Sequence, residues 1–281
     1  MSITSVPTSV SVGLTLPFFR EETERLIEVA IAAELVGLDA VFAYDHLFRY
    51  AGDGSVRPAL EFSAVLGALC AETTSISIAS LVARATLRPP AVLAGIFKTA
   101  RRIAGERIIA GIGAGDEQSR DEMENFGYTF GDISSRVEAL EAATAALVDT
   151  GIPVWVAGDP KYVGAAVMMA DGWNRWGVSL DRFGREASQL NAERKNRGGS
   201  PLLISWGGVC VLGATDEEAL EKAERLGATD VSLVGGPERV AKMLMGFVNA
   251  GASWIALGPI DSADSSNAVH AKAIRDLLNV G

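Results

Sequence analysis

The stretch ELVGLDAVFA at residues 34–43 consists of the end of a helix, a glycine, a short polar link and an apolar strand. The same pattern recurs in RLGATDVSLV (225–234) and NAGASWIALG (249–258), and more loosely in MADGWNRWG (169–177). A glycine at this place fits a left-handed helix C-cap, and the next strand starts within a few residues. Such helix-to-strand turns occur in any α/β protein, so the repeat predicts the class rather than one fold.

Eight short β-rich runs alternate with stretches whose apolar residues recur every three or four positions. Alternating strands and helices are typical of a parallel sheet, and eight such units in about 250 residues is the size of a closed (β/α)8, or TIM, barrel. An open doubly wound sheet is the alternative. No Pro-, Gly- or Ser-rich linker divides the chain, so we expect a single barrel domain over 1–281. The eight runs lie at residues 10–16, 39–44, 75–82, 107–113, 153–158, 172–178, 202–213 and 253–258.

The composition excludes several classes of partner. The 281 residues include 25 Lys and Arg against 35 Asp and Glu, which gives a net charge of -10. Nucleic acid and anionic membrane surfaces both attract basic faces, so we expect neither as a partner. The first 20 residues lack the pattern of a signal peptide, and no run of about 18 apolar residues predicts a membrane span. Cys70 and Cys210 are too few for a disulfide framework or a zinc site, so we expect a cytoplasmic protein without a metal.

In a barrel of this kind the active site lies just beyond the C-terminal ends of the strands. Asp45 and His46 follow the second run, and the other histidine, His270, falls in the last helical stretch. A histidine beside a carboxylate at a strand end is typical of a proton-transfer group, with a structural loop histidine as the alternative. His46 is therefore the candidate acid–base residue.

The fourth run leads into GIGAGDEQSRDE, where Gly111, Gly113 and Gly115 are closely spaced and Asp116 follows. This is not the G-x-G-x-x-G fingerprint, and no first βαβ unit precedes it, so a Rossmann-type dinucleotide site is excluded. Closely spaced glycines instead let the backbone approach a flat ligand. Asp116 is predicted to project from this strand end.

The fifth run ends in Ala157 and Gly158 and passes through Asp159 and Pro160 into a helix, with Lys161 in its first turn. Free backbone N–H groups at a helix N-terminus form an anion site, to which Lys161 adds charge. A plain helix cap by Asp159 is the alternative. We favour phosphate binding at this position.

Two other strand ends carry residues with two interpretations each. Arg84 and Arg88, after the third run, are either ligands for an anion or surface charges. Trp173, Asn174 and Trp176, in the sixth run, either form a wall for a planar cofactor or pack within the barrel.

Taken together, these segments resemble the bacterial luciferase-like family of flavin- and deazaflavin-dependent oxidoreductases. The resemblance spans nearly the whole chain, in family order, and is strong as an ordered set although each motif alone is weak. The matching stretches are VGLTLP (12–17), GLDAVFAYDHLF (37–48), RPPAVLAGIFKTARRIAGERIIAGIGAGD (88–116), GIPVWVAGDPKYVGAAVMMADGWNRWG (151–177), ISWGGVCVLGATDEEA (204–219) and GASWIALGP (251–259).

The resemblance implies a barrel with a cofactor across its C-terminal mouth, either FMN in monooxygenases or the deazaflavin F420 in hydride-transfer enzymes. YDH at 44–46 and GAGD at 113–116 look more like the F420 branch. In that branch His46 and Asp116 occupy the catalytic positions, although the dehydrogenases usually have Glu where Asp116 stands. His46 would accept the proton of a substrate hydroxyl, and Asp116 would orient the substrate or relay a proton.

The resemblance also implies a cofactor site, a small organic substrate and a homodimer. It places a cis peptide bond between Ser80 and Leu81, behind the cofactor ring. The alternatives are an FMN-dependent monooxygenase or reductase, and a non-catalytic flavin-binding relative. A phosphate-binding isomerase or aldolase would need a Schiff-base lysine or a metal cluster, which the strand ends lack. The implied cofactor-binding residues are Asp45, Ser80, Leu81, Val82, Ala83, Ala114, Gly115, Ala157, Gly158, Asp159, Pro160 and Lys161.

Overall fold

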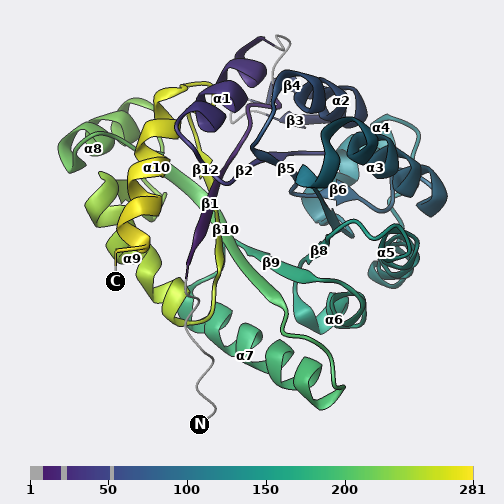
Figure 1. Ribbon diagram of the computed structural model, residues 1–281. Helices are drawn as coiled ribbons and strands as arrows, with labels where there is room; N and C mark the ends of the chain where they lie inside the picture. The colour runs from purple at the N-terminus through teal and green to yellow at the C-terminus, as the bar shows by residue number, and fades with distance from the viewer. Residues whose placement is uncertain (1–8, 20–23, 51–53, 281) are drawn as a thin grey trace.

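In the computed structural model, which describes residues 9–19, 24–50 and 54–280, eight parallel strands close into a barrel (Figure 1). Closure is completed by β10, which pairs with β9 on one side and with β12 on the other, while β12 pairs with β1. The predicted (β/α)8 barrel is confirmed, and each strand coincides with one of the eight β-rich runs. The barrel strands are β1 (Ser11–Thr15), β2 (Ala40–Ala43), β5 (Ser77–Ser80), β7 (Ile108–Gly113), β8 (Val154–Ala157), β9 (Gly172–Trp176), β10 (Leu203–Leu212) and β12 (Trp254–Pro259).

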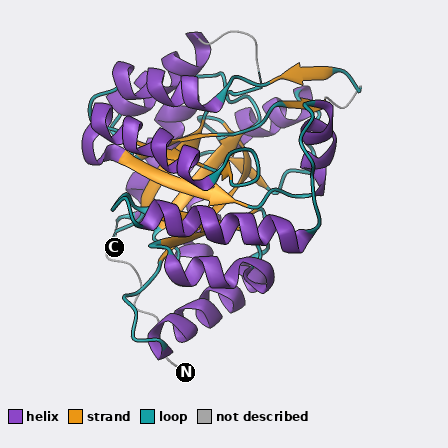
Figure 2. Ribbon diagram, turned by 90° about the vertical axis from the view of Figure 1, so that its right-hand side faces the viewer, coloured by secondary structure: helices purple, strands orange, loops and turns teal. Residues whose placement is uncertain are grey.

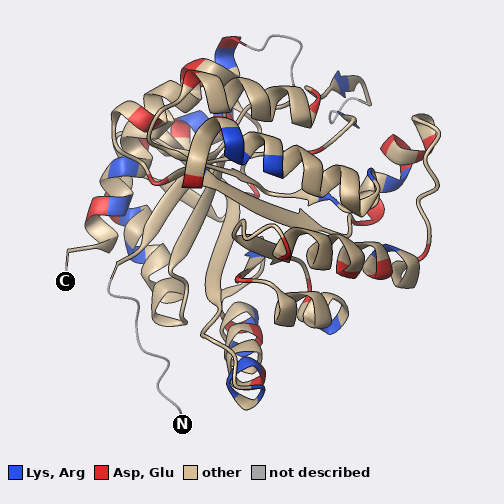
Figure 3. Ribbon diagram, turned by 45° about the vertical axis from the view of Figure 1, so that its right-hand side comes forward, with Lys and Arg blue, Asp and Glu red and all other residues tan. Residues whose placement is uncertain are grey.

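Helices surround the strands on the outside, as Figure 2 shows. Their apolar faces pack on the barrel, and their charged residues are interspersed on the outer helices and loops, whereas the strands are largely uncharged (Figure 3). The long helices are α1 (Glu24–Leu35), α2 (Phe62–Glu72), α3 (Pro90–Ala104), α5 (Ile133–Val148), α6 (Pro160–Met169), α7 (Leu180–Asn196), α8 (Asp216–Arg225), α9 (Pro237–Asn249) and α10 (Ser266–Leu278). Within the described part of the chain, no helix combines the length and apolarity that crossing a membrane requires.

Several short elements fall outside the predicted alternation. A hairpin of β3 (Phe48–Tyr50) and β4 (Val56–Pro58) lies between β2 and α2. The two-residue strand β6 (Ala83–Arg84) pairs with β7, and β11 (Leu233–Gly235) pairs with the end of β10. The short helix α4 (Arg120–Asn125) follows β7. All four are at or beyond strand ends, so they elaborate the mouth rather than the barrel wall.

Two apolar layers stabilise the barrel. The interior is filled by large side chains, with the ring of Trp155 6.4 Å from that of Phe42 and 5.1 Å from that of Trp254. The outer layer lies between strands and helices, where Trp173 stacks on Phe183 of α7 at 5.8 Å. Trp173 therefore packs against a helix and does not form a wall of the mouth.

Polar contacts fasten the N-terminal end of the barrel, opposite the mouth. The Glu34 carboxylate, near the end of α1, accepts hydrogen bonds from the backbone N–H groups of residues 74–76, just before β5. The Asn279 side chain accepts from the N–H of Val10 at 2.8 Å and donates to its carbonyl at 2.9 Å. The start of β1 is thereby tied to the end of α10.

Candidate active site

The predicted site residues lie at the C-terminal mouth of the barrel. Asp45 and His46 follow β2, Asp116 follows β7, and Gly158 follows β8. Because these strands are parallel neighbours in one sheet, their carboxyl ends open at the same edge. The four residues therefore lie at one end of the molecule.

The His46 imidazole is held by two charged side chains. Its Nδ1 lies 2.8 Å from Oε1 of Glu122, on α4, and 2.7 Å from Nη2 of Arg84, on β6. The Arg84 guanidinium also forms a close ion pair with the same Glu122 oxygen. Arg84 and Glu122 are buried, whereas the His46 side chain is 28% exposed, so the ring reaches the mouth from a buried ion pair.

Glu122 is bound on both oxygens. Its Oε2 accepts hydrogen bonds from the N–H groups of Leu47 at 2.8 Å and Phe48 at 3.4 Å. Burial raises the pKa of Glu122, but the hydrogen bond and charge of His46, the charge of Arg84 and the Leu47 N–H outweigh it and lower the pKa to about 2. Glu122 is therefore ionised across the physiological range.

Asp45 has a different set of partners. Its buried carboxylate accepts from the backbone N–H of Arg84 at 2.9 Å and from the Arg88 guanidinium at 2.6 and 3.2 Å. Arg88 also contacts Glu61 at 3.0 Å. Both arginines after the third strand are thus engaged in ion pairs. Nη1 of Arg84, which is buried, has no hydrogen-bond partner among the described residues.

The cis peptide bond lies between Leu81 and Val82. The predicted position, Ser80–Leu81, was wrong by one residue. The reason is strand pairing. The Leu81 N–H donates to the Ala43 carbonyl at 2.8 Å, so regular pairing with β2 continues through this amide. The Ser80 hydroxyl donates to the Gly111 carbonyl at 2.6 Å and anchors the segment on β7.

The glycines of the fourth run make room for this segment. A Cβ atom on Gly111 would lie 1.9 Å from the Ser80 carbonyl oxygen, and one on Gly113 would lie 2.7 Å from Cγ2 of Val82. Both approaches are shorter than any van der Waals contact. The closely spaced glycines therefore make room for the adjacent segment at residues 80–82 of the same chain. From the sequence, this room was predicted to serve a flat ligand.

The start of α6 carries more charge than Lys161 alone. Asp159 caps the helix by accepting from the Lys161 N–H at 3.0 Å, and its carboxylate also contacts Arg175 at 3.3 Å and Arg182 at 2.5 Å. The Lys161 ammonium is exposed and lies over the Tyr162 ring at 5.1 Å. The cationic groups nearest the helix cap are therefore the two arginines, which the sequence did not single out.

Trp176 lies on the inner face of β9. A Cβ atom on Gly207 would be 2.5 Å from its ring, and one on Gly258 would be 2.8 Å away. The indole therefore rests on the backbone of β10 and β12 at the mouth, and part of its surface is exposed. Of the three residues considered in the sixth run, Trp176 is the one with an exposed part at the mouth, whereas Trp173 and Asn174 are buried.

Asp116 is exposed, and its carboxylate accepts from the Ser119 hydroxyl at 3.2 Å. The carboxylate that contacts His46 is instead Glu122, six positions later. Sequence reasoning missed Glu122 because five acidic residues follow the fourth strand within nine positions (116, 117, 121, 122 and 124). Only the short helix α4 decides which of them turns inward.

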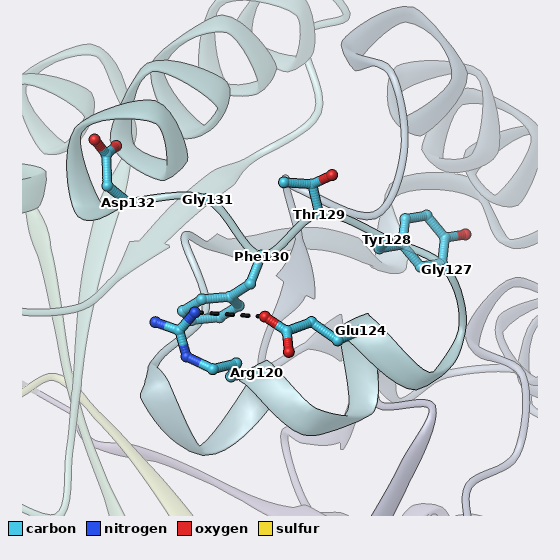
Figure 4. A pocket seen from close by; sticks show the side chains of 8 residues that line it. All are labelled: Arg120, Glu124, Gly127, Tyr128, Thr129, Phe130, Gly131 and Asp132. Carbon is cyan, nitrogen blue, oxygen red and sulfur yellow. Dashed lines mark hydrogen bonds and ion pairs between the residues drawn. The ribbon is translucent and has the colours of Figure 1, made fainter.

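Figure 4 shows a separate pocket of about 640 Å³ on the segment from α4 to the start of α5. Arg120 and Glu124 pair across its rim at 3.5 Å, and the Arg120 guanidinium covers the Phe130 ring at 4.4 Å. None of its lining residues contacts His46. Among the residues that the structure describes, no group of His, Cys, Asp and Glu side chains is arranged to hold a metal ion.

A closed (β/α)8 barrel with a histidine and its carboxylate partner at the mouth is an architecture of enzymes that act on small molecules at the strand ends. The chain belongs to the luciferase-like monooxygenase family, whose family model matches residues 4–230.

Curated relatives match part of the chain. An F420-dependent glucose-6-phosphate dehydrogenase of Amycolatopsis mediterranei is 37% identical over 93 residues, which is 32% of this chain and 27% of that protein. A protein of the same description from Kribbella flavida is 30% identical over 139 residues, 49% of this chain and 40% of that protein. The matched segments therefore span less than half of these relatives.

Solved structures match over nearly the whole length. An F420-dependent secondary alcohol dehydrogenase, in complex with an F420–acetone adduct, superposes with a TM-score of 0.80 at 16% identity, covering 96% of this chain and 99% of that chain. The F420-dependent tetrahydromethanopterin reductase of Methanopyrus kandleri gives 0.74 at 16% identity, with coverages of 96% and 99%. The EDTA monooxygenase of Chelativorans sp. BNC1 gives 0.76 at 14% identity, with coverages of 97% and 95%. At these identities the likeness establishes the fold.

Proposed function

We propose that this protein is an oxidoreductase that transfers a hydride between the deazaflavin F420 and a small organic substrate. The observation that carries the proposal is the His46 imidazole at the end of β2, held by buried Glu122 and Arg84 and reaching the mouth. The names of the curated relatives and of two structural neighbours, all F420-dependent, support the choice of cofactor.

The residues at the mouth fit such a cofactor. The segment 80–83 runs alongside β7, where Ser80 bonds the Gly111 carbonyl and Ala83 pairs with Ile112, and Ala114 and Gly115 follow β7 at the same end. The buried Nη1 of Arg84 has an unused donor that a polar ring edge would satisfy. For the phosphate we propose residues 157–161, where the backbone N–H groups at the start of α6 and the exposed Lys161 supply the positive field in an acidic chain. Arg175 and Arg182 nearby are paired with Asp159 and Glu186, so they add no net charge there.

The cofactor, when bound, supplies the carbon that accepts or gives the hydride. His46 takes the proton from the substrate hydroxyl in the oxidative direction and returns it in the reductive direction, because an imidazole exchanges protons near neutral pH. Asp116, which is exposed at the same mouth, is proposed to orient the substrate.

Cofactor binding is tested by titrating the purified protein with F420 and, separately, with FMN, and following absorbance and fluorescence. We expect saturable binding of F420 and substrate-dependent loss of its violet absorbance with alcohols or sugar phosphates. Binding of FMN with oxygen consumption would instead establish the monooxygenase alternative. Binding without turnover of any substrate would identify a non-catalytic flavin-binding protein.

His46→Ala is expected to lower kcat by about 10²- to 10⁴-fold, the usual contribution of a general acid–base group, and to leave F420 affinity within a few-fold. The matched control is His270→Ala, which removes the other histidine, on α10. Steady-state kinetics and F420 titration of both variants show whether His46 acts in turnover or in cofactor binding. Full kcat in His46→Ala would make His46 a structural residue.

A further inference from the structure

Two charged groups meet at one nitrogen of His46. Nδ1 lies 2.8 Å from Oε1 of Glu122 and 2.7 Å from Nη2 of Arg84. A carboxylate oxygen only accepts hydrogen bonds and a guanidinium nitrogen only donates them, whereas a neutral imidazole nitrogen does one or the other. Nδ1 therefore satisfies only one of the two groups at a time, and the choice fixes where the ring carries its proton.

The carboxylate is the better partner for Nδ1. Glu122 is buried and ionised, so a bare Nδ1 would direct its lone pair at a negative oxygen 2.8 Å away. A protonated Nδ1 instead donates a charge-assisted hydrogen bond to that oxygen. In this arrangement Arg84 gives up Nδ1 as an acceptor, but its Nη2 keeps the ion pair with Glu122, which is the stronger of its two contacts.

The remaining surroundings do not oppose this arrangement. The rings of Phe19 and Tyr44 lie 5.2 and 6.2 Å from the imidazole, and burial raises the pKa of the Tyr44 hydroxyl to about 12, so both are uncharged. The neighbouring Asp45 is bound to the backbone of Arg84 and to the Arg88 side chain. The positive charge of Arg84 balances the negative charge of Glu122 beside the ring. No described residue bonds the second ring nitrogen, Nε2.

We propose that Glu122 is a positioning residue that keeps the proton of neutral His46 on Nδ1, so that Nε2 presents its lone pair to the substrate hydroxyl, and that Arg84 holds Glu122 in place. The assignment rests on the proposed role of His46 as the base. When Nε2 accepts the hydroxyl proton as the hydride leaves, the imidazolium keeps its Nδ1–H bond to Glu122. The charge that develops on the ring is then met by a carboxylate already in contact with it.

The tautomer is measured without any cofactor. The chain has two histidines, so protein labelled with ¹⁵N-histidine gives two ring systems in a long-range ¹H–¹⁵N spectrum, and His270→Gln assigns them. In the neutral form of the His46 ring, we expect Nδ1 to show the chemical shift of a protonated nitrogen and Nε2 that of an unprotonated one. The opposite pattern in the wild-type protein overturns the proposal, whether or not any variant folds.

Glu122→Gln is expected to reverse the tautomer. The N–H groups of Leu47 and Phe48 still require an acceptor, which places the amide oxygen there and turns the NH₂ group toward Nδ1. Arg84, whose Nη2 no longer has a carboxylate oxygen to pair with, then also donates to Nδ1. Nδ1 then accepts, and the proton moves to Nε2. The matched control is Glu124→Gln, on the same helix, which removes the exposed carboxylate paired with Arg120. An unchanged His46 spectrum in folded Glu122→Gln would contradict the assignment.

Kinetics separate this proposal from the proposed function. With F420 and a substrate that turns over, Glu122→Gln should lower kcat by about 10²-fold or more with little change in KM, and Glu124→Gln should change neither. A protonated Nδ1 in a protein that turns over no F420 substrate would leave the tautomer assignment intact and refute the proposed function. Turnover by wild-type protein with a bare Nδ1 would do the reverse.

Discussion

Arg88 is the main counter-charge of a carboxylate that has almost no contact with water. Asp45 is 2% exposed and accepts two hydrogen bonds from the Arg88 guanidinium, which is itself 16% exposed. Removing one partner of such a pair leaves the other charge buried and uncompensated, which costs far more than a surface ion pair contributes. The pair therefore fixes the loop that carries His46.

Arg88→Ala is expected to lower the free energy of unfolding by about 3 kcal/mol, the lower end of the range for breaking a buried pair, because the Arg84 N–H still binds Asp45. Urea unfolding measures the loss, and the control is Arg102→Ala, an exposed arginine of α3. The double variant Asp45→Asn/Arg88→Ala should recover part of the stability. If Arg88→Ala unfolds with the midpoint of the control, the pair does not stabilise the loop.

The sequence predicted which strand ends carry charge, but not which charges meet. His46 was found because histidine is rare in this chain and follows a strand directly. Its partner Glu122 was hidden among five neighbouring acidic residues, since helical periodicity over the six residues of α4 is too short to mark an inward face. From the sequence, Arg84 was as consistent with a surface charge as with an anion ligand, because its burial depends on β6, a strand of two residues.

At the scale of the elements, the eight barrel strands were predictable because most of the runs are apolar and helical stretches separate them. The hairpin β3–β4 and the short strands β6 and β11 were not, because they lack alternation and depend on neighbours for their pairing. The position of the cis bond was one residue off for a related reason. The family resemblance places the cis bond only near the end of β5, whereas the hydrogen bond from the Leu81 N–H to the Ala43 carbonyl keeps the Ser80–Leu81 amide in regular pairing with β2.

The Glu34 carboxylate links α1 to the start of β5. Burial acts to raise its pKa, but hydrogen bonds from the backbone of Ser75, Ile76 and Thr74 outweigh this and lower the pKa from 4.5 to about 2. A depressed pKa in the folded state means that this contribution to stability is present above about pH 4.5. It is lost as the pH falls through 4.5 toward 2.

Glu34→Gln is therefore expected to lower the free energy of unfolding by about 1 kcal/mol at pH 7, and the difference from wild type should vanish as the pH approaches 2. Melting temperatures from pH 7 down to pH 2.5 test this. Glu28→Gln, which removes an exposed carboxylate of the same helix paired with Arg25, serves as control. A Glu34→Gln deficit that stays constant with pH would rule out the charge as its source.

At the scale of the whole molecule, the surface formed by α2 and α3 exposes apolar side chains around a groove. A groove of about 430 Å³ runs between α2 and α3, with Gly67 and Gly95 in its lining and the apolar side chains of Val92 and Ile103, 51% and 56% exposed, beside them. Its lining carries no charge, although the chain has a net charge of -10. A two-fold interface brings the same patch of both copies together, so the apolar ridge of one copy can enter the groove of the other. We propose that a second copy of the chain covers this surface.

The protein is accordingly expected to sediment as a homodimer at micromolar concentration, at twice the chain mass of 29.5 kDa. Ile103→Glu should shift the mass toward one chain, because a carboxylate would be buried in an apolar contact. Val269→Glu, at an equally exposed apolar position on α10, should not. Wild-type protein that sediments as a monomer, or a dimer unaffected by Ile103→Glu, would remove this face from consideration.

The hydrogen bonds between Val10 and Asn279 have a consequence for the order of the chain. They bring residues 269 positions apart into contact, at the end of the barrel away from His46. The eight βα units thus form a closed ring in space. Val10 and Asn279 lie close enough together for a linker of a few residues to join them. A circular permutant, joined across this gap and opened at another turn on the same end, would keep every strand neighbour that the mouth requires. The arrangement of the candidate site therefore does not depend on which of the βα units comes first in the chain.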